Sequence, residues 1–173
     1  MIRGHCLIHS SCFTFNRRGY IVSAYSGAGK TTVLLKILNK GGDYLSDELT
    51  IISKNGKALC YPLPVTLCDY NMKDLPKSKS NYLLHIRKYI SKIIRTFTRG
   101  VCKLPQSIHI NDIFPDTVIK KDPINYKMYL LTSDEKELSS DINKFIAELV
   151  NINKLQFRAF EHVRLLYVSE VNH

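Results

Sequence analysis

Long apolar runs are missing from this chain. Hydrophobic residues make up 45% of its 173 residues, but no segment approaches the roughly 20 consecutive apolar residues of a membrane-spanning helix. The start, MIRGHCLIHSSC, also lacks the layout of a secretory signal peptide. We therefore expect a cytoplasmic protein that does not enter a membrane.

Cysteine pairs at metal-binding spacing are also missing. The chain has five cysteines, an odd number, and none of them forms a CxxC pair. A structural zinc site needs such closely spaced ligands. We expect reduced thiols, with Cys6 and Cys12 packed as small hydrophobic side chains.

Acidic residues are scarce relative to basic ones. Lys and Arg total 25 against 15 Asp and Glu, and residues 71–103 alone hold 9 basic residues against 1 acidic. Three interpretations of this segment remain open, in descending order: a solvated helix face, a docking surface for an acidic protein or peptide, and a nucleic-acid patch. Nucleic acid ranks last because specific single-strand binding also needs aromatic stacking platforms. Tyr82 and Tyr89 are available, but Tyr89 falls close to the apolar stripe of the predicted helix.

The length favours one domain over residues 1–173, large enough to fold without disulfides. Hydrophobic periodicity and turn residues divide it into a core (5–67), the basic helical segment (71–103) and C-terminal strands and helices (104–173). Strands are predicted at 5–15, 19–25, 44–53, 57–67, 106–113 and 126–132. Helices are predicted from 31 to about 40, at 81–98, at 138–153, and over 155–168, where a helix leading into a strand is the alternative.

The segment SGAGKTT lies between a predicted strand and a predicted helix. Glycines in this context let backbone N–H groups turn towards an anion at a helix N-terminus. Lys30 would reach the β- and γ-phosphates of a nucleotide, and the Thr31 hydroxyl would complete a Mg²⁺ shell. The predicted nucleotide-binding residues are Ser26, Gly27, Ala28, Gly29, Lys30, Thr31 and Thr32. The alternative is a glycine-rich turn that happens to precede a helix, and Ala24 stands where the full motif has its first glycine.

Two adjacent acids, Asp47 and Glu48, follow in LSDELTII. Unpaired carboxylates are costly inside a strand, whereas beside a nucleotide one can bind metal and the other can accept a proton. The alternative is a solvated strand end.

Over residues 5–67 the chain resembles the HPr kinase/phosphorylase and phosphoenolpyruvate carboxykinase superfamily. Three segments match in the order expected for that superfamily: IHSSC, which contains His9, then SGAGKTT, then YLSDELTII. The resemblance implies that Asp47 is the proton-transfer residue and that Glu48, where the family usually has aspartate, binds the metal with Thr31. It also implies a catalytic role for Lys30 and for His9, which is otherwise a half-buried strand histidine. The large N-terminal domain of the carboxykinases has no counterpart, which argues against their reaction.

The expected fold is α/β: a mixed, twisted sheet, a phosphate loop (P-loop) between strand and helix, and C-terminal helices, similar to the C-terminal domain of HPr kinases. The implied function is that of an ATP- and Mg²⁺-dependent kinase, which transfers the γ-phosphoryl group to a Ser/Thr or small-molecule hydroxyl. A protein or peptide acceptor and assembly into a homo-oligomer are compatible with this function. The alternative is a non-catalytic ATP-binding module that acts through a protein partner. A GTPase switch ranks below both because a TKxD-like base-reading motif is missing.

Overall fold

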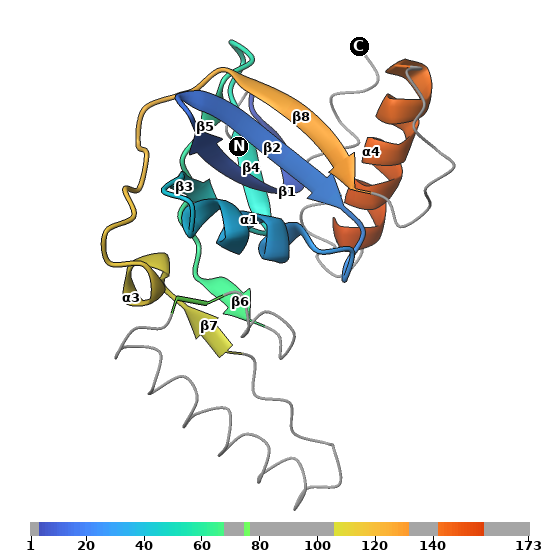
Figure 1. Ribbon diagram of the computed structural model, residues 1–173. Helices are drawn as coiled ribbons and strands as arrows, with labels where there is room; N and C mark the ends of the chain where they lie inside the picture. Colours follow the sequence, from blue (N-terminus) through green and yellow to red (C-terminus); the bar gives the residue numbers. More distant parts are fainter. Residues whose placement is uncertain (1–3, 68–74, 77–105, 132–141, 158–173) are drawn as a thin grey trace, which may run out of the picture.

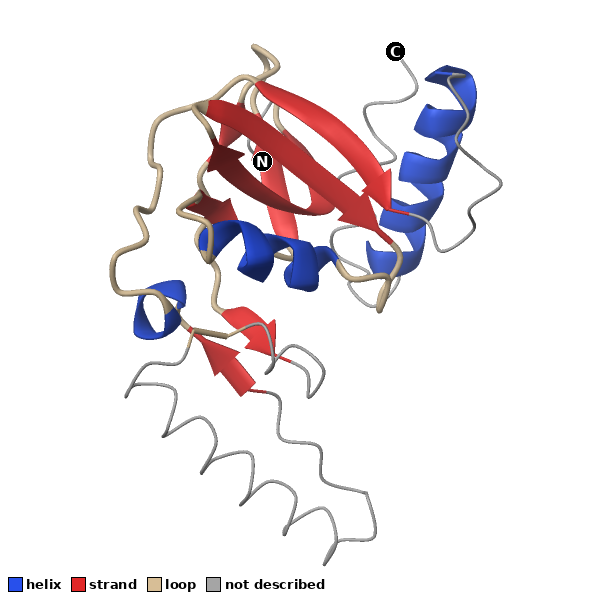
Figure 2. Ribbon diagram, viewed as in Figure 1, coloured by secondary structure: helices blue, strands red, loops and turns tan. Residues whose placement is uncertain are grey.

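The computed structural model describes residues 4–67, 75–76, 106–131 and 142–157. These residues form a mixed sheet with helices packed against it, which confirms the coarse α/β class (Figures 1 and 2). The predicted helix at 81–98 and the predicted elements beyond residue 157 lie outside the described residues. None of the helices in the described part is long and apolar enough to span a bilayer.

The main sheet is built around the first two strands. Its strands are β1 (Cys6–Phe15), β2 (Arg18–Ala24), β3 (Asp43–Ser46), β4 (Leu49–Ile52), β5 (Ala58–Leu59) and β8 (Tyr126–Leu131). The order is β5-β4-β1-β2-β8, with β3 also paired to β1. Among the named strands that the structure describes, β8 alone runs parallel to its neighbour, β2. The strands predicted at 5–15, 19–25 and 126–132 are confirmed.

A two-residue turn joins β1 to β2. Phe15 pairs with Arg18, and the two residues between them have positive φ angles, 50° at Asn16 and 61° at Arg17. This left-handed pair matches the twist of a tight antiparallel hairpin. The turn therefore fixes the register of the two central strands.

The prediction of a single strand at 44–53 is wrong, because the structure divides this segment into β3 and β4. Both pieces pair antiparallel with β1, β3 with residues 12–14 and β4 with residues 6–9. Asp47 and Glu48 form the interruption between them. The break removes both acids from the regular ladder, which frees Asp47 to turn inward.

Two further predicted strands are shorter than expected. The 57–67 segment yields only β5 and β6 (Val65–Leu67), separated by the prolines at 62 and 64, which cannot donate to a ladder. The 106–113 segment is β7 (Gln106–Ile108) followed by the short helix α3 (Ile110–Ile113). β6 and β7 pair with each other in a separate small sheet.

The two faces of the main sheet are buried differently. Helix α1 (Lys30–Leu38) packs on one face together with β6, β7 and α3, and α4 (Ile142–Phe157) contributes Leu149 to the other (Figure 1). Strand alternation assigns neighbours to opposite faces. Phe13 and Val22 belong to the α1 side, whereas Cys12 and Ile21 belong to the α4 side. The helix predicted at 138–153 is confirmed as α4 from residue 142 onward, and α4 continues to Phe157 without the predicted break before residue 155. Residues 138–141 lie outside the described residues.

Candidate functional site

The segment between β2 and α1 has the backbone that an anion-binding loop requires. Gly27 has a φ of 83° and Gly29 a φ of 103°, values that favour glycine. An added Cβ at either position would meet nothing within 4 Å, so conformation rather than space explains these glycines. Gly29 caps α1 without a side-chain hydrogen bond. The N–H groups at the start of an α-helix point out of the helix end, and no side chain caps them at Gly29.

Lys30, at the start of α1, extends towards β1. Its Nζ lies 2.7 Å from Nε2 of His9, and both residues are buried. Burial, followed by the positive charge of Lys30, lowers the pKa of His9 to about 4. His9 is therefore neutral at pH 7, and its Nε2 lone pair accepts a hydrogen bond from the Lys30 ammonium group.

Glu48 lies on the other side of the His9 ring. Its Oε2 is 3.6 Å from Nδ1 of His9, and its side chain is 42% exposed. Because the ring is neutral, this contact is not an ion pair, and it is too long for a hydrogen bond. Glu48 also has a φ of 68°, and the N–H of Leu49 donates to the carbonyl of Asp47 over 2.9 Å. These features describe a strained three-residue turn centred on Glu48.

Asp47 is fully buried beneath the loop. One carboxylate oxygen accepts a hydrogen bond from the Ser11 hydroxyl, and the other accepts one from the Thr31 hydroxyl over 3.0 Å. Burial raises the pKa of Asp47, while the hydroxyl of Ser11 acts in the opposite direction. Asp47 thus connects β1 and the β3–β4 break to the first turn of α1.

A hydroxyl network lies beside this group. Thr50 Oγ1 is 2.8 Å from both Ser10 Oγ and Ser46 Oγ, and Ser23 donates to the His9 carbonyl over 2.8 Å. Buried hydroxyls need such partners. The network ties β1 to β2, β3 and β4 around the site.

Helix α4 reaches the same place from the opposite face. Asn153, buried, accepts a hydrogen bond from the His9 N–H over 2.7 Å and donates to the Leu149 carbonyl over 2.8 Å. At the exposed end of the loop, the Tyr25 hydroxyl donates to Glu148 over 2.6 Å. α4 is therefore attached both to the strand that carries His9 and to the residue that begins the loop.

The structure brings most of the predicted site residues together. His9, Lys30, Thr31, Asp47 and Glu48 form one connected cluster. Ser26, Gly27 and Ala28 are exposed in the loop, and Thr32 is half-buried in the first turn of α1. Thr31 donates to Asp47. The expectation that Thr31 and Glu48 hold a metal ion stays a prediction.

Sequence reasoning missed Ser11 and Asn153. Ser11 is an unremarkable strand serine until Asp47 is seen beside it. Asn153 gave a weak signal, a polar residue four positions after Leu149 on an amphipathic helix.

Comparisons with models of known protein families and with curated proteins found no match. The resemblance to the HPr kinase superfamily therefore depends on the residues of the cluster and loop alone, and it stays a prediction.

Proposed function

We propose that the chain binds ATP with Mg²⁺ on residues 26–32 and transfers the γ-phosphoryl group to a hydroxyl of a Ser/Thr side chain or a small molecule. One observation carries the proposal: Lys30 and Thr31, adjacent at the N-terminus of α1, are each bonded to a buried group of the neighbouring strands, His9 and Asp47. A glycine turn with a structural role alone has no need for either bond.

The loop suits phosphate oxygens. The first-turn N–H groups and the helix dipole favour an anion at this helix end, and α1 has no acidic residue in its first turn to compete for it. Lys30 adds a full positive charge. Its hydrogen-bond partner is a neutral imidazole rather than a carboxylate, so the nearby Asp47 carboxylate, which also interacts with this charge, offsets it without a direct bond.

Mg²⁺ fits the oxygen atoms present. It prefers a few hard oxygen ligands together with substrate phosphates, and the Thr31 hydroxyl and an Asp47 carboxylate oxygen already lie 3.0 Å apart. A group of three His, Cys, Asp or Glu ligands is not found among the described residues, and nucleotide-bound Mg²⁺ does not need one. The metal would supply neutralisation of charge between phosphates.

The geometry favours roles for Asp47 and Glu48 that are the reverse of those implied by the resemblance. Asp47 is fully buried and contacts Thr31, so we assign it to the metal side. Glu48 has a side chain that is 42% exposed, so an incoming hydroxyl can reach it. We assign the proton-accepting role to Glu48, with neutral His9 next to its carboxylate.

The second candidate function is the non-catalytic ATP-binding module that acts through a protein partner. The full burial of Asp47 keeps an acceptor hydroxyl from the residue that the resemblance designates as the base, so the chain binds ATP without transferring it unless Glu48 takes that role. The raised pKa of Asp47 suits a base chemically, but access to the carboxylate is a prior condition.

The test combines binding with transfer. We expect calorimetric titration with ATP–Mg²⁺ to show binding by the parent chain and a loss of most affinity in Lys30→Ala, with the fold retained by circular dichroism. Lys36→Ala, at an exposed lysine of the same helix, is the matched control and should bind like the parent. Unchanged affinity in folded Lys30→Ala would overturn the phosphate-loop proposal.

Labelled ATP with candidate acceptor proteins then separates the two functions. Transfer of the labelled γ-phosphoryl group supports the kinase. Binding without transfer or hydrolysis across the acceptors supports the module.

A further inference from the structure

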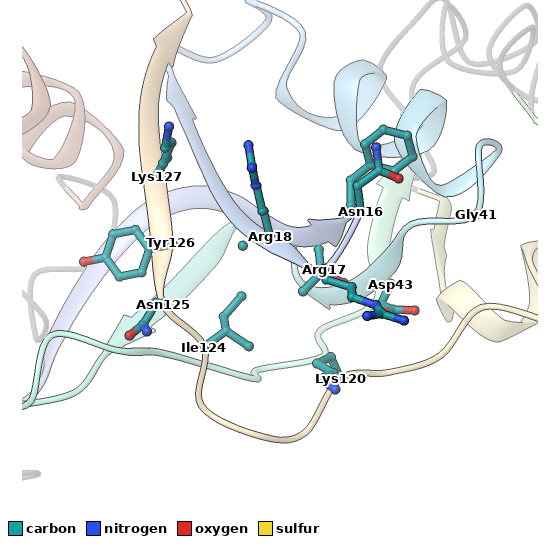
Figure 3. A pocket seen from close by; sticks show the side chains of 13 residues that line it. Asn16, Arg17, Arg18, Gly41, Asp43, Lys120, Ile124, Asn125, Tyr126 and Lys127 are labelled. Atoms are coloured by element: carbon teal, nitrogen blue, oxygen red, sulfur yellow. The ribbon is translucent and has the colours of Figure 1, made fainter.

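The two ends of β2 differ in how the surrounding side chains are arranged. An open hollow lies at the start of β2, and its basic side chains do not converge on one point (Figure 3). Lys120 at its rim, for example, lies 3.9 Å from Asp122. At the other end of β2, side chains from β2, α1 and α4 all bond to one residue, His9. The elements of the fold thus converge at the end of the sheet that carries the phosphate loop.

At His9, a side chain of α4 takes the place of a strand partner for β1. The ladder between β1 and β2 begins at Ser10, which pairs with Ser23, so the N–H of His9 lies just beyond it. That N–H donates to Oδ1 of Asn153 over 2.7 Å, and both residues are buried. A buried backbone N–H without an acceptor is costly. The position of β1 at His9 therefore depends on Asn153.

The packing of α4 holds Asn153 in place. Its Nδ2 donates to the carbonyl of Leu149, one turn earlier in the helix, over 2.8 Å. Leu149 packs against the core on this face of the sheet, and Ile152 is buried. α4 contacts both β1 and β2 (Figure 1), and its Glu148 accepts the hydrogen bond from Tyr25 at the start of the loop. Asn153 therefore offers His9 an acceptor whose position is set by the docking of α4.

His9 also carries the ring that holds Lys30. Its Nε2 lies 2.7 Å from Lys30 Nζ, and its carbonyl accepts a hydrogen bond from Ser23 over 2.8 Å. The N–H and the C=O of His9 are thus both bonded, and the position of the ring follows from that of the backbone. A lysine has a long flexible side chain, so the ring decides where the ammonium group lies. A charge that is already in position binds its ligand more tightly, because less freedom is lost on binding.

We propose that Asn153 is a positioning residue of the phosphate site: it fixes His9, which in turn fixes the Lys30 ammonium group where the phosphates of ATP bind. The inference rests on the proposed function for the identity of the ligand. The attachment of α4 then raises the affinity of the loop for the nucleotide. By linkage, a bound nucleotide also strengthens the attachment of α4.

The first experiment compares two variants of α4 by calorimetric titration with ATP–Mg²⁺. Asn153→Leu removes the acceptor and should weaken binding about twofold to thirtyfold, the range expected for a residue that couples two sites. Ile152→Val, at the neighbouring buried position, also loosens the packing of α4 but retains the acceptor, and it should bind like the parent. Parent-like affinity in Asn153→Leu would overturn the proposal, as would equal weakening in the two variants.

A double variant tests whether Asn153 acts through the imidazole. His9→Gln removes the ring, so adding Asn153→Leu to it should weaken ATP–Mg²⁺ no further. Two independent effects would instead multiply. Multiplied effects would show that Asn153 reaches the loop by another route, against the proposal.

Titration of the His9 ring by NMR needs no nucleotide and so separates this inference from the proposed function. Among the described residues, Lys30 and Glu48 are the charged side chains in contact with the ring. The pKa of His9, about 4 in the parent, should rise towards 6.5 in Asn153→Leu, because the ring becomes less buried and less close to Lys30. It should stay near 4 in Ile152→Val. An unchanged pKa in folded Asn153→Leu would refute the positioning role, whereas a parent chain that binds no ATP–Mg²⁺ would refute the proposed function and leave this titration to decide the role of Asn153.

Hydrogen exchange of the parent chain covers the case in which Asn153→Leu does not fold. ATP–Mg²⁺ should slow amide exchange in α4 of the parent and of the control Lys36→Ala, because nucleotide binding and α4 attachment are linked. It should have little effect on α4 in Lys30→Ala. Exchange in α4 that does not respond to bound nucleotide in the parent chain would overturn the proposal.

Discussion

Lys30 and His9 form a hydrogen bond of 2.7 Å between a buried ammonium group and a buried neutral imidazole. A carboxylate in the place of His9 would hold the lysine more strongly but would cancel its charge. The imidazole positions the cation and leaves the charge in place for a phosphate. The low pKa of His9 is a consequence of this arrangement, and it can be measured.

The first prediction concerns the titration of His9. Its ring resonances should remain those of a neutral imidazole well below pH 6.5 and change near pH 4, because burial and the Lys30 charge oppose protonation. In Lys30→Met the pKa of His9 should rise towards 6.5, since one of the two causes is removed. A His9 that protonates near 6.5 in the parent chain would contradict the observed contact.

The same shift gives a stability prediction with a defined sign. The unfolded chain binds a proton at His9 near pH 6.5 and the folded chain only near pH 4, so the free energy of unfolding should fall as the pH drops through this window. The raised pKa of Asp47 acts in the opposite direction. Comparing parent with His9→Gln by urea unfolding isolates the histidine: the slope between these pH values should be smaller in the variant.

The third prediction separates the two acids. Glu48→Gln should retain ATP–Mg²⁺ binding and lower transfer by about 10²–10⁴-fold, the usual contribution of a general base. Asp47→Asn should instead raise the Mg²⁺ concentration needed for binding. A magnesium titration of binding and transfer distinguishes them. The reverse pattern would restore the roles implied by the family resemblance, and two variants that match the parent would leave the acids without a function.

A fourth prediction tests the attachment of α4. Asn153→Leu leaves the buried N–H of His9 without its acceptor, which should cost about 1–3 kcal/mol of unfolding free energy. Tyr25→Phe removes the exposed hydrogen bond to Glu148 and should change stability by no more than about 0.5 kcal/mol. Chemical denaturation measures both. Similar losses in the two variants would show that α4 is not held through His9.

The fifth prediction compares two glycines. Gly29→Ala has space for the methyl group but forces alanine to a φ of 103°, so it should distort the loop and weaken ATP–Mg²⁺ binding. Gly19→Ala meets a backbone oxygen at 2.3 Å and should destabilise the fold by about 1–3 kcal/mol, with ATP binding retained where the chain is folded. Calorimetry measures the loss of ATP–Mg²⁺ binding, and thermal melting measures the loss of stability.

Local patterns were sufficient for the parts of this protein that depend on neighbours in the chain. The alternation in residues 5–15 and 19–25, the glycines of SGAGK and the helical spacing of Val33, Leu34 and Ile37 were enough to predict strand, loop and helix in the right order. These features follow from backbone stereochemistry and side-chain periodicity, which act over a few residues. Lys30, Thr31, Asp47 and Glu48 were predicted from the loop motif and the two adjacent acids, whereas His9 was predicted only through the resemblance to the HPr kinase superfamily.

Tertiary structure alone decided how those residues meet. A continuous strand over 44–53 was a reasonable prediction from its residues, but pairing with β1 splits it at Asp47 and Glu48, buries one acid against Thr31 and leaves the other beside His9. Ser11, 36 residues from Asp47 along the chain, and Asn153, 144 residues from His9, enter the site only because the sheet and α4 bring them there. Burial and hydrogen bonding between distant segments decide which of the two adjacent carboxylates is desolvated. A local sequence pattern cannot predict this, because the segments that bury the carboxylate lie far away along the chain.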